Sequence, residues 1–172
     1  MTLRNNARLA GAAFLVYIAA GIGGMSHRFG PAADVEFSFV EVFCALILAV
    51  TLYAITRDVD QDIALLAFTC RVGEGAVGAA ATVAHFNGFA GGATLFAAGS
   101  TLFCWLLLRG RLIPRALAWL GVLGSLLVLA VVPLQFAKVL PDTFFYVWLP
   151  LLVFELTFAV WLIVRGVNRP LL

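Results

Sequence analysis

Six apolar runs, each long enough to cross a bilayer, occupy most of this chain of 172 residues. A helix needs about 17–25 mostly apolar residues to span the hydrocarbon core. Only short polar stretches separate the runs, so there is no room for a soluble domain beside them. The sequence therefore predicts an all-α integral membrane bundle, with residues 1–172 forming a single six-helix domain. The predicted spans are 7–25, 37–56, 63–86, 91–108, 115–137 and 143–164.

The charge content supports this class and excludes others. Charged residues make up 12% of the chain and hydrophobic residues 63%, whereas a soluble domain carries about 25% charged residues. The formal net charge is only +2. The expected partners are therefore membrane lipids with anionic headgroups, and nucleic acid is not expected.

The distribution of Lys and Arg predicts the orientation, because cytoplasmic loops of membrane proteins carry the excess of positive charge. Six spans place both termini on one side, and the opposite side carries only Arg28 and Lys138. We therefore expect an N-in, C-in protein, and the bias fits the inner membrane of a bacterium. The side with the termini carries Arg4, Arg8, Arg57, Arg109, Arg111, Arg115, Arg165 and Arg169.

Away from the ends of the predicted spans, four ionisable residues lie among apolar residues: Glu41, Arg71, Glu74 and Glu155. A charge at mid-depth costs roughly 3 kcal/mol on insertion scales, so such residues usually pair and often mark a functional site. The helical rise puts Arg71, Glu74 and Glu155 about 14, 18 and 15 Å from the cytoplasmic end, and Glu41 at about 24 Å. In a core of about 30 Å, we expect a polar pocket between spans two, three and six.

The spacing of these residues suggests acid–base chemistry. Arg71 and Glu74 are three residues apart and can pair on one helical turn, and we expect Glu155 to bring a second carboxylate to the same guanidinium. Two carboxylates in one dry site do not both ionise easily, so one is expected to be protonated. Our hypothesis is a membrane enzyme that isomerises, cyclises or opens an epoxide of a lipophilic small molecule. Either Glu155 or Glu74 would be the protonated acid and the other the base. Arg71 would be the charge that distinguishes them, and Glu41 a further site residue.

Two other functions fit the same residues. In a non-catalytic membrane subunit or assembly factor, the cluster would only hold helices together, and the chain would have a protein partner or form a homo-oligomer. Outward-facing Gly21, Gly23 and Gly24 would favour that alternative. A proton-coupled transporter is the second. No metal or cofactor is expected, because the polar residues near the non-cytoplasmic face match no ligand spacing; these are His27, Glu36, Glu41 and His85.

Stripes of small and polar residues predict which helix faces pack inward, because such residues dominate contacts between helices in lipid. The stripe in span three also carries the charges. Trp105 falls in the stripe of span four, although the tryptophans as a group are expected near span ends as interfacial anchors. The stripes are Ala10, Ala13, Tyr17, Gly21 and Gly24 in span one; Arg71, Glu74, Gly75, Gly78, Thr82 and His85 in span three; Thr94, Ala98, Thr101 and Trp105 in span four; and Gly121, Gly124, Ser125, Val128, Val132 and Gln135 in span five.

Several short motifs resemble those of a bacterial multi-pass membrane family catalogued as domain of unknown function 4386. The resemblance implies a six-helix membrane protein in which the Arg-x-x-Glu pair and the late Glu are family features, and it implies no activity. The motifs are Arg8-Leu9-Ala10-Gly11, Arg71-x-x-Glu74, Leu112-Ile113-Pro114-Arg115-x-Leu117, and Glu155-Leu156 with the ending Trp161-Leu162-Ile163-Val164-Arg165-Gly166.

Overall fold

A computed structural model describes residues 2–140 and 144–168, and within these residues all regular structure is helical. Each helix is long and apolar enough to cross a membrane, which confirms the predicted multi-pass membrane bundle. Thr143, at the start of the predicted sixth span, and Arg169 lie outside the described residues. The helices are α1 (Leu3–Ser26), α2 (Pro31–Thr56), α3 (Gln61–Ala84), α4 (Phe89–Arg109), α5 (Arg115–Phe136) and α6 (Phe144–Val164).

The helix ends follow local capping rules. The Thr2 hydroxyl accepts a hydrogen bond from the Asn5 N–H at 3.3 Å, so α1 begins four residues before its predicted apolar run. Pro31 is in the first turn of α2, where a backbone N–H would have no acceptor within the helix. This helix begins six residues before its predicted span. Asp60 caps α3 by accepting from the Ile63 N–H at 3.2 Å.

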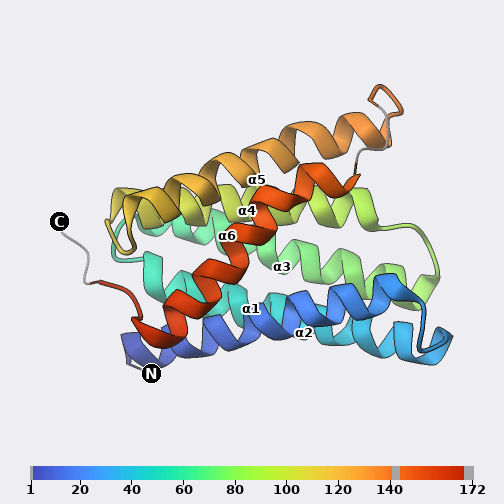
Figure 1. Cartoon of the computed structure of the whole chain (residues 1–172), viewed down its shortest axis with the longest axis horizontal. Coiled ribbons are helices and arrows are strands. Elements are labelled where there is room, and N and C mark those ends of the chain that lie inside the picture. Colours follow the sequence, from blue (N-terminus) through green and yellow to red (C-terminus); the bar gives the residue numbers. More distant parts are fainter. Residues whose placement is uncertain (1, 141–143, 169–172) are drawn as a thin grey trace.

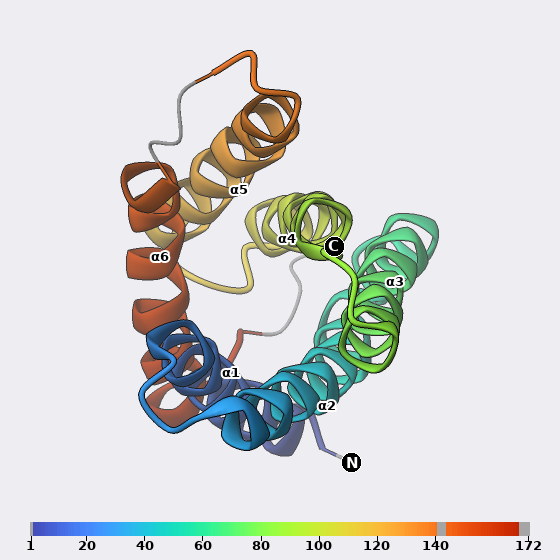
Figure 2. The ribbon, with the colours of Figure 1, turned by 90° about the vertical axis from the view of Figure 1, so that its right-hand side faces the viewer.

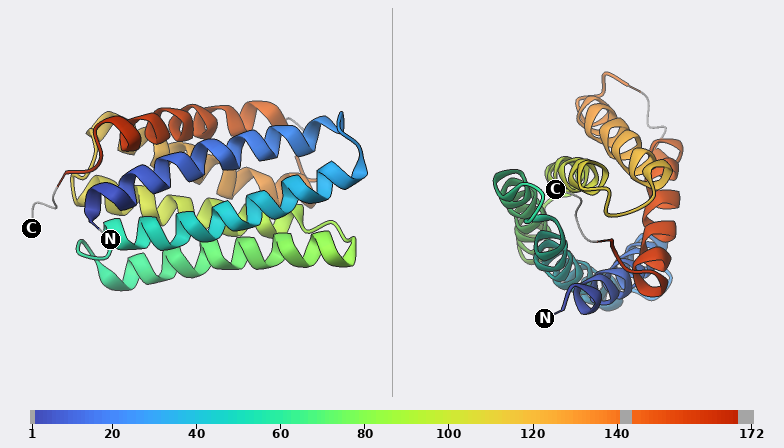
Figure 3. Two further views of the ribbon diagram at one scale, coloured as in Figure 1. Left: turned by 90° about the horizontal axis from the view of Figure 1, so that it is seen from below. Right: turned by 90° about the vertical axis from the view of Figure 1, so that its left-hand side faces the viewer.

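The helices form a ring in sequence order, with α4 nearest its middle (Figures 1 and 2). Each helix packs against the next, and α6 closes the ring against α1. The beginning of α1 and the end of α6 lie at one end of the bundle (Figure 3). We call the half nearest residues 3 and 164 the termini half, and the half nearest residues 26 and 144 the cavity half.

Glycines allow close helix crossings where α6 meets its neighbours. A Cβ added to Gly11 of α1 would lie 2.6 Å from the backbone oxygen of Ala159 on α6. One added to Gly124 of α5 would lie 3.1 Å from the backbone nitrogen of Leu151. The whole stripe predicted for span five is buried, as expected for a face that packs inward.

Trp105 departs from the predicted stripe of span four, because it is 45% exposed on the outside of the bundle. The neighbouring Cys104 occupies the contact with α5, where a Cβ on Gly121 would lie 2.6 Å from its sulfur. There is no room for an indole at that crossing. Thr101 of the same stripe does face α5, since its hydroxyl lies 3.0 Å from that of Ser125.

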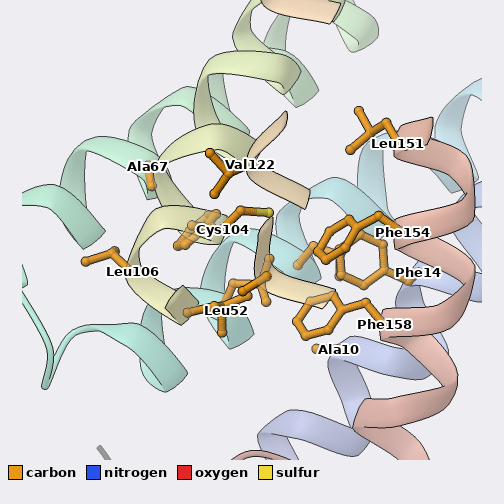
Figure 4. Close-up of a cluster of buried hydrophobic side chains, with 14 of the residues drawn as sticks. Ala10, Phe14, Leu52, Ala67, Cys104, Leu106, Val122, Leu151, Phe154 and Phe158 are labelled. Atoms are coloured by element: carbon orange, nitrogen blue, oxygen red, sulfur yellow. The ribbon is translucent and has the colours of Figure 1, made fainter. Parts of the chain in front are cut away.

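Aromatic and aliphatic side chains fill the interior toward the termini half (Figure 4). The Phe158 ring meets Phe154 in a stacked arrangement at 5.2 Å and Phe14 edge-on at 5.7 Å. These rings pack between α1 and α6, with Leu52 of α2 and Leu106 of α4 buried in the same cluster. The interior around these rings is therefore apolar.

Candidate functional site

Arg71 and Glu74 form an ion pair within α3, at the spacing that the sequence predicted. The Arg71 Nη1 lies 2.7 Å from the Glu74 Oε2. Arg71 is 1% exposed and Glu74 is also buried. A charge this deep is costly without an opposite charge. The pair therefore neutralises itself inside one helix and needs no other helix to do so.

Tyr17 of α1 connects this pair to the rest of the bundle. Its hydroxyl donates a hydrogen bond to the Glu74 Oε1 at 2.7 Å. The guanidinium carbon of Arg71 lies 5.5 Å from the centre of the Tyr17 ring and 4.9 Å from that of Phe96 on α4. The two rings stack nearly parallel, 6.3 Å apart. Contact with aromatic rings partly replaces the water that the cation has lost.

Gly99 of α4 leaves space for the aliphatic part of the Arg71 side chain. A Cβ on Gly99 would lie 3.2 Å from the Cγ of Arg71 and 3.2 Å from the backbone oxygen of Ala67. The Nε and Nη2 of Arg71 have no hydrogen-bond partner among the described residues. The guanidinium is thus held by one carboxylate and two rings rather than by a full set of hydrogen bonds.

Glu155 lies on α6 and is 6% exposed. The expected direct pairing of Glu155 with Arg71 is not seen: within residues 2–140 and 144–168, Glu155 forms neither an ion pair nor a hydrogen bond. The reason is the order of the ring, in which α6 packs on α1 and α5 while α3 packs on α2 and α4. Glu155 is nevertheless close enough to interact electrostatically with both Arg71 and Glu74.

Glu41 lies on α2, toward the end of this helix that belongs to the cavity half. It is partly buried and has no hydrogen-bond or ion-pair partner in the described part of the chain. Its carboxyl group occupies the space left by Gly21 of α1, where a Cβ would lie 2.9 Å from the Glu41 Oε1.

Two cavities open in the cavity half, and the three glutamates line them. The Glu74 cavity, of about 270 Å³, lies among α1, α2, α3, α4 and α6 and contains Glu41 and Glu74 in its wall. The Glu155 cavity, of about 250 Å³, lies among α1, α2, α4 and α6 and contains Glu41 and Glu155. Their shared wall consists of Tyr17, Glu41, Phe89, Phe96 and Trp148.

The predicted pocket between spans two, three and six was therefore incomplete. Four of the stripe residues of span three do line the Glu74 cavity, namely Glu74, Gly75, Gly78 and Thr82. However, α1 and α4 also contribute, through Tyr17 and Phe96. His85 of the same stripe is exposed at the end of α3.

Sequence reasoning missed three aromatic site residues. Tyr17 is predicted only as part of a packing stripe, although a hydroxyl in the middle of an apolar span needs a partner, and that is a usable signal. Trp148 is predicted to be an interfacial anchor, whereas its ring stacks on Phe96 at 5.7 Å and faces both cavities. Nothing in the sequence distinguishes Phe96 from the other phenylalanines.

Comparison with known families gives one assignment. The sequence model described as Domain of unknown function (DUF4386) matches residues 80–166, half of the chain. The matched part includes the turn at 112–117 and Glu155, but neither Arg71 nor Glu74. No match is found among the curated proteins or among the solved structures. The chain belongs to the family described as Domain of unknown function (DUF4386).

Proposed function

We propose that this protein is a membrane enzyme that binds a lipophilic small molecule in the cavity half and performs acid–base chemistry on it. The observation that carries the proposal is Glu155, a buried carboxyl group that lines a cavity and has no partner among the described residues. A polar group without a partner is costly in a dry interior, so it is retained at a cost to stability. Functional sites are where proteins tolerate such costs.

The three glutamates support different roles within the site. Glu74 is held as a carboxylate by Arg71 and Tyr17, both at 2.7 Å, which suits a base of fixed position. Glu155 forms no hydrogen bond or ion pair with the described residues, so its carboxyl group remains available to donate a proton to a bound molecule. We assign Glu155 as the acid and Glu74 as the base. Glu41 would complete the polar wall that both cavities share.

The alternative of a purely structural cluster accounts for only part of the site. The hydrogen bond from Tyr17 to Glu74 does join α1 to α3. The ion pair of Arg71, by contrast, lies within one helix. Neither Glu41 nor Glu155 forms a hydrogen bond or an ion pair with another helix among the described residues. The glycines that an outside partner would use face inward instead. Gly21 lies against Glu41, and Gly23 and Gly24 lie against Phe37.

An untargeted comparison of lipophilic metabolites tests the proposal. Membranes from cells that express the wild type, Glu74→Gln or Glu155→Gln would be extracted and analysed by untargeted mass spectrometry. We expect a product that appears with the wild type and is lost in both variants. Glu36→Gln is the matched control, because Glu36 is exposed on the same helix as Glu41. Identical profiles for the wild type and both site variants, at equal levels of folded protein, would contradict the proposal.

We also propose that the termini end faces the cytoplasm of a bacterial inner membrane. Arginines gather at that end in the described part of the chain, on both termini and in the connections between α2 and α3 and between α4 and α5. Single cysteines introduced at Asp58 and at Asn87 test this orientation, because these residues lie in connections at opposite ends. An impermeant thiol reagent applied to intact cells should label the cysteine at position 87 and not the one at position 58. The reverse pattern would overturn the orientation.

A further inference from the structure

The Glu155 cavity has a composition that selects a positively charged guest. Two carboxyl groups line it, Glu41 and Glu155, and none of the described residues in its wall is Lys, Arg or His. The nearby Arg71 is not part of this wall, and its charge is balanced by Glu74 at 2.7 Å. An anionic guest would therefore meet carboxyl oxygens and no positive charge, whereas an ammonium group would pair with a carboxylate in this wall.

Aromatic rings form much of the remaining wall. Tyr17, Phe89, Phe96 and Trp148 all line the cavity. The Trp148 ring lies 5.7 Å from Phe96 and 6.2 Å from Phe89, so the three rings form one continuous surface. Aromatic faces attract organic ammonium groups through their quadrupoles, most strongly when the site is desolvated. Carboxyl groups beside aromatic rings thus suit an ammonium better than a hydrated inorganic cation.

The cavity is also accessible from the side of the bundle. In Figure 1, α6 crosses α1 near the termini end and runs toward α5 at the other end. The cavity lies between the parts of α1 and α6 that diverge, with Ile22, Met25 and Leu149 at its edge. The first two are 62% and 65% exposed on the surface that faces lipid. A guest can therefore enter from the bilayer with its apolar body between α1 and α6.

From these three features we infer that the Glu155 cavity binds a lipophilic amine in its ammonium form. The nitrogen would lie at the Glu155 carboxyl group and the Trp148 ring, and the apolar body would point between α1 and α6 toward the lipid. An amine that arrives uncharged from the bilayer takes the proton of Glu155 onto its nitrogen lone pair. This transfer leaves a carboxylate paired with an ammonium and conserves total charge. The inference rests on the proposed function, since it names the substrate class of the same site.

Binding of two isosteric probes to the full-length protein in detergent tests this inference. Benzyltrimethylammonium carries a fixed positive charge, and neopentylbenzene has the same shape with carbon in place of nitrogen. Binding is followed by Trp148 fluorescence in a variant whose other tryptophans (Trp105, Trp119 and Trp161) are replaced by Phe. We expect saturable binding of the ammonium and binding of the neutral probe that is weaker by about tenfold or more.

Glutamine variants show whether the ammonium probe binds in the Glu155 cavity. Glu155→Gln should weaken ammonium binding by about tenfold or more, and Glu41→Gln by a smaller factor. Glu36→Gln, at an exposed glutamate, should leave it unchanged. Since Glu41 and Glu155 have no partner to lose among the described residues, these variants are expected to fold.

Three results would overturn the inference. If neopentylbenzene binds as tightly as benzyltrimethylammonium, the cavity takes a neutral lipophile, and the proposed acid–base function stands without the amine. If the ammonium probe does not saturate, or binds Glu155→Gln as well as the wild type, the cavity is not a cation site. The metabolite comparison then tests the proposed function separately.

Discussion

The two halves of the bundle are built from the same kinds of residue but are packed differently. From the middle of the bundle toward the termini end, Phe14, Phe154 and Phe158 fill the space between α1 and α6 with their rings. In the cavity half, Tyr17, Phe96 and Trp148 also stack, yet cavities of about 270 and 250 Å³ remain around them. Every mid-span glutamate lines one of these cavities. The comparison indicates that the packed rings provide stability and that the candidate site begins where this packing becomes incomplete, at Glu155 beside Phe154.

The largest expected effect is the loss of a ring from the termini half. Phe158→Ala removes a side chain that is 1% exposed and contacts two other rings. In lipid, packing rather than water exclusion drives helix association, and the cavity left behind should lower the free energy of unfolding by about 3 kcal/mol. Titration with sodium dodecyl sulfate in mixed micelles measures this change. The lipid-facing Phe43→Ala is the control, and an equal loss there would contradict the assignment of the core.

A comparable loss is expected at Glu74, the one carboxylate in the cavity walls that has an ion-pair partner among the described residues. Glu74→Gln removes the counter-charge of Arg71 and weakens the hydrogen bond from Tyr17. Removing one partner of a buried ion pair costs about 3–5 kcal/mol, because the other charge is left uncompensated. We expect a loss at the lower end of this range, with the bundle still folded. In a double-mutant cycle with Tyr17→Phe, the two effects should not add, because they remove one shared contact. Additive losses would mean that the hydrogen bond contributes nothing.

Parts of this site follow from local spacing, and parts do not. The pair of Arg71 and Glu74 was predictable because three residues on a helix bring two side chains together regardless of the rest of the fold. The position of Glu155 relative to Arg71 was not, since equal depth in the membrane does not say which helices are neighbours. The six spans follow from hydropathy alone. The contributions of α1 and α4 to the site depend on ring order and on the glycines at 21 and 99, which only the structure reveals.

Gly21 offers a smaller, more specific test of the cavity half. In Gly21→Ala the new methyl group would lie 2.9 Å from the Glu41 Oε1, so this flexible side chain must move. We expect stability to change by less than about 1 kcal/mol, while binding of benzyltrimethylammonium weakens a few-fold. Gly24→Ala is the matched control on the same helix, because its methyl group would make an ordinary contact of 3.6 Å with Phe37. Equal effects of the two variants on binding would show that the position of Glu41 does not affect binding of the ammonium probe.

Thermal unfolding of Glu155→Gln beside the wild type, both in the same detergent, tests the central claim most directly. A carboxyl group that belongs to the site and forms no contact that holds helices together should be replaceable without loss of thermal stability. We therefore predict an unchanged or higher Tm, where each 1 kcal/mol of stability corresponds to about 2–4 °C for a chain of this size. A fall in Tm as large as that of Glu74→Gln would show that Glu155 holds the bundle together, and would contradict the division between a packed half and a functional half.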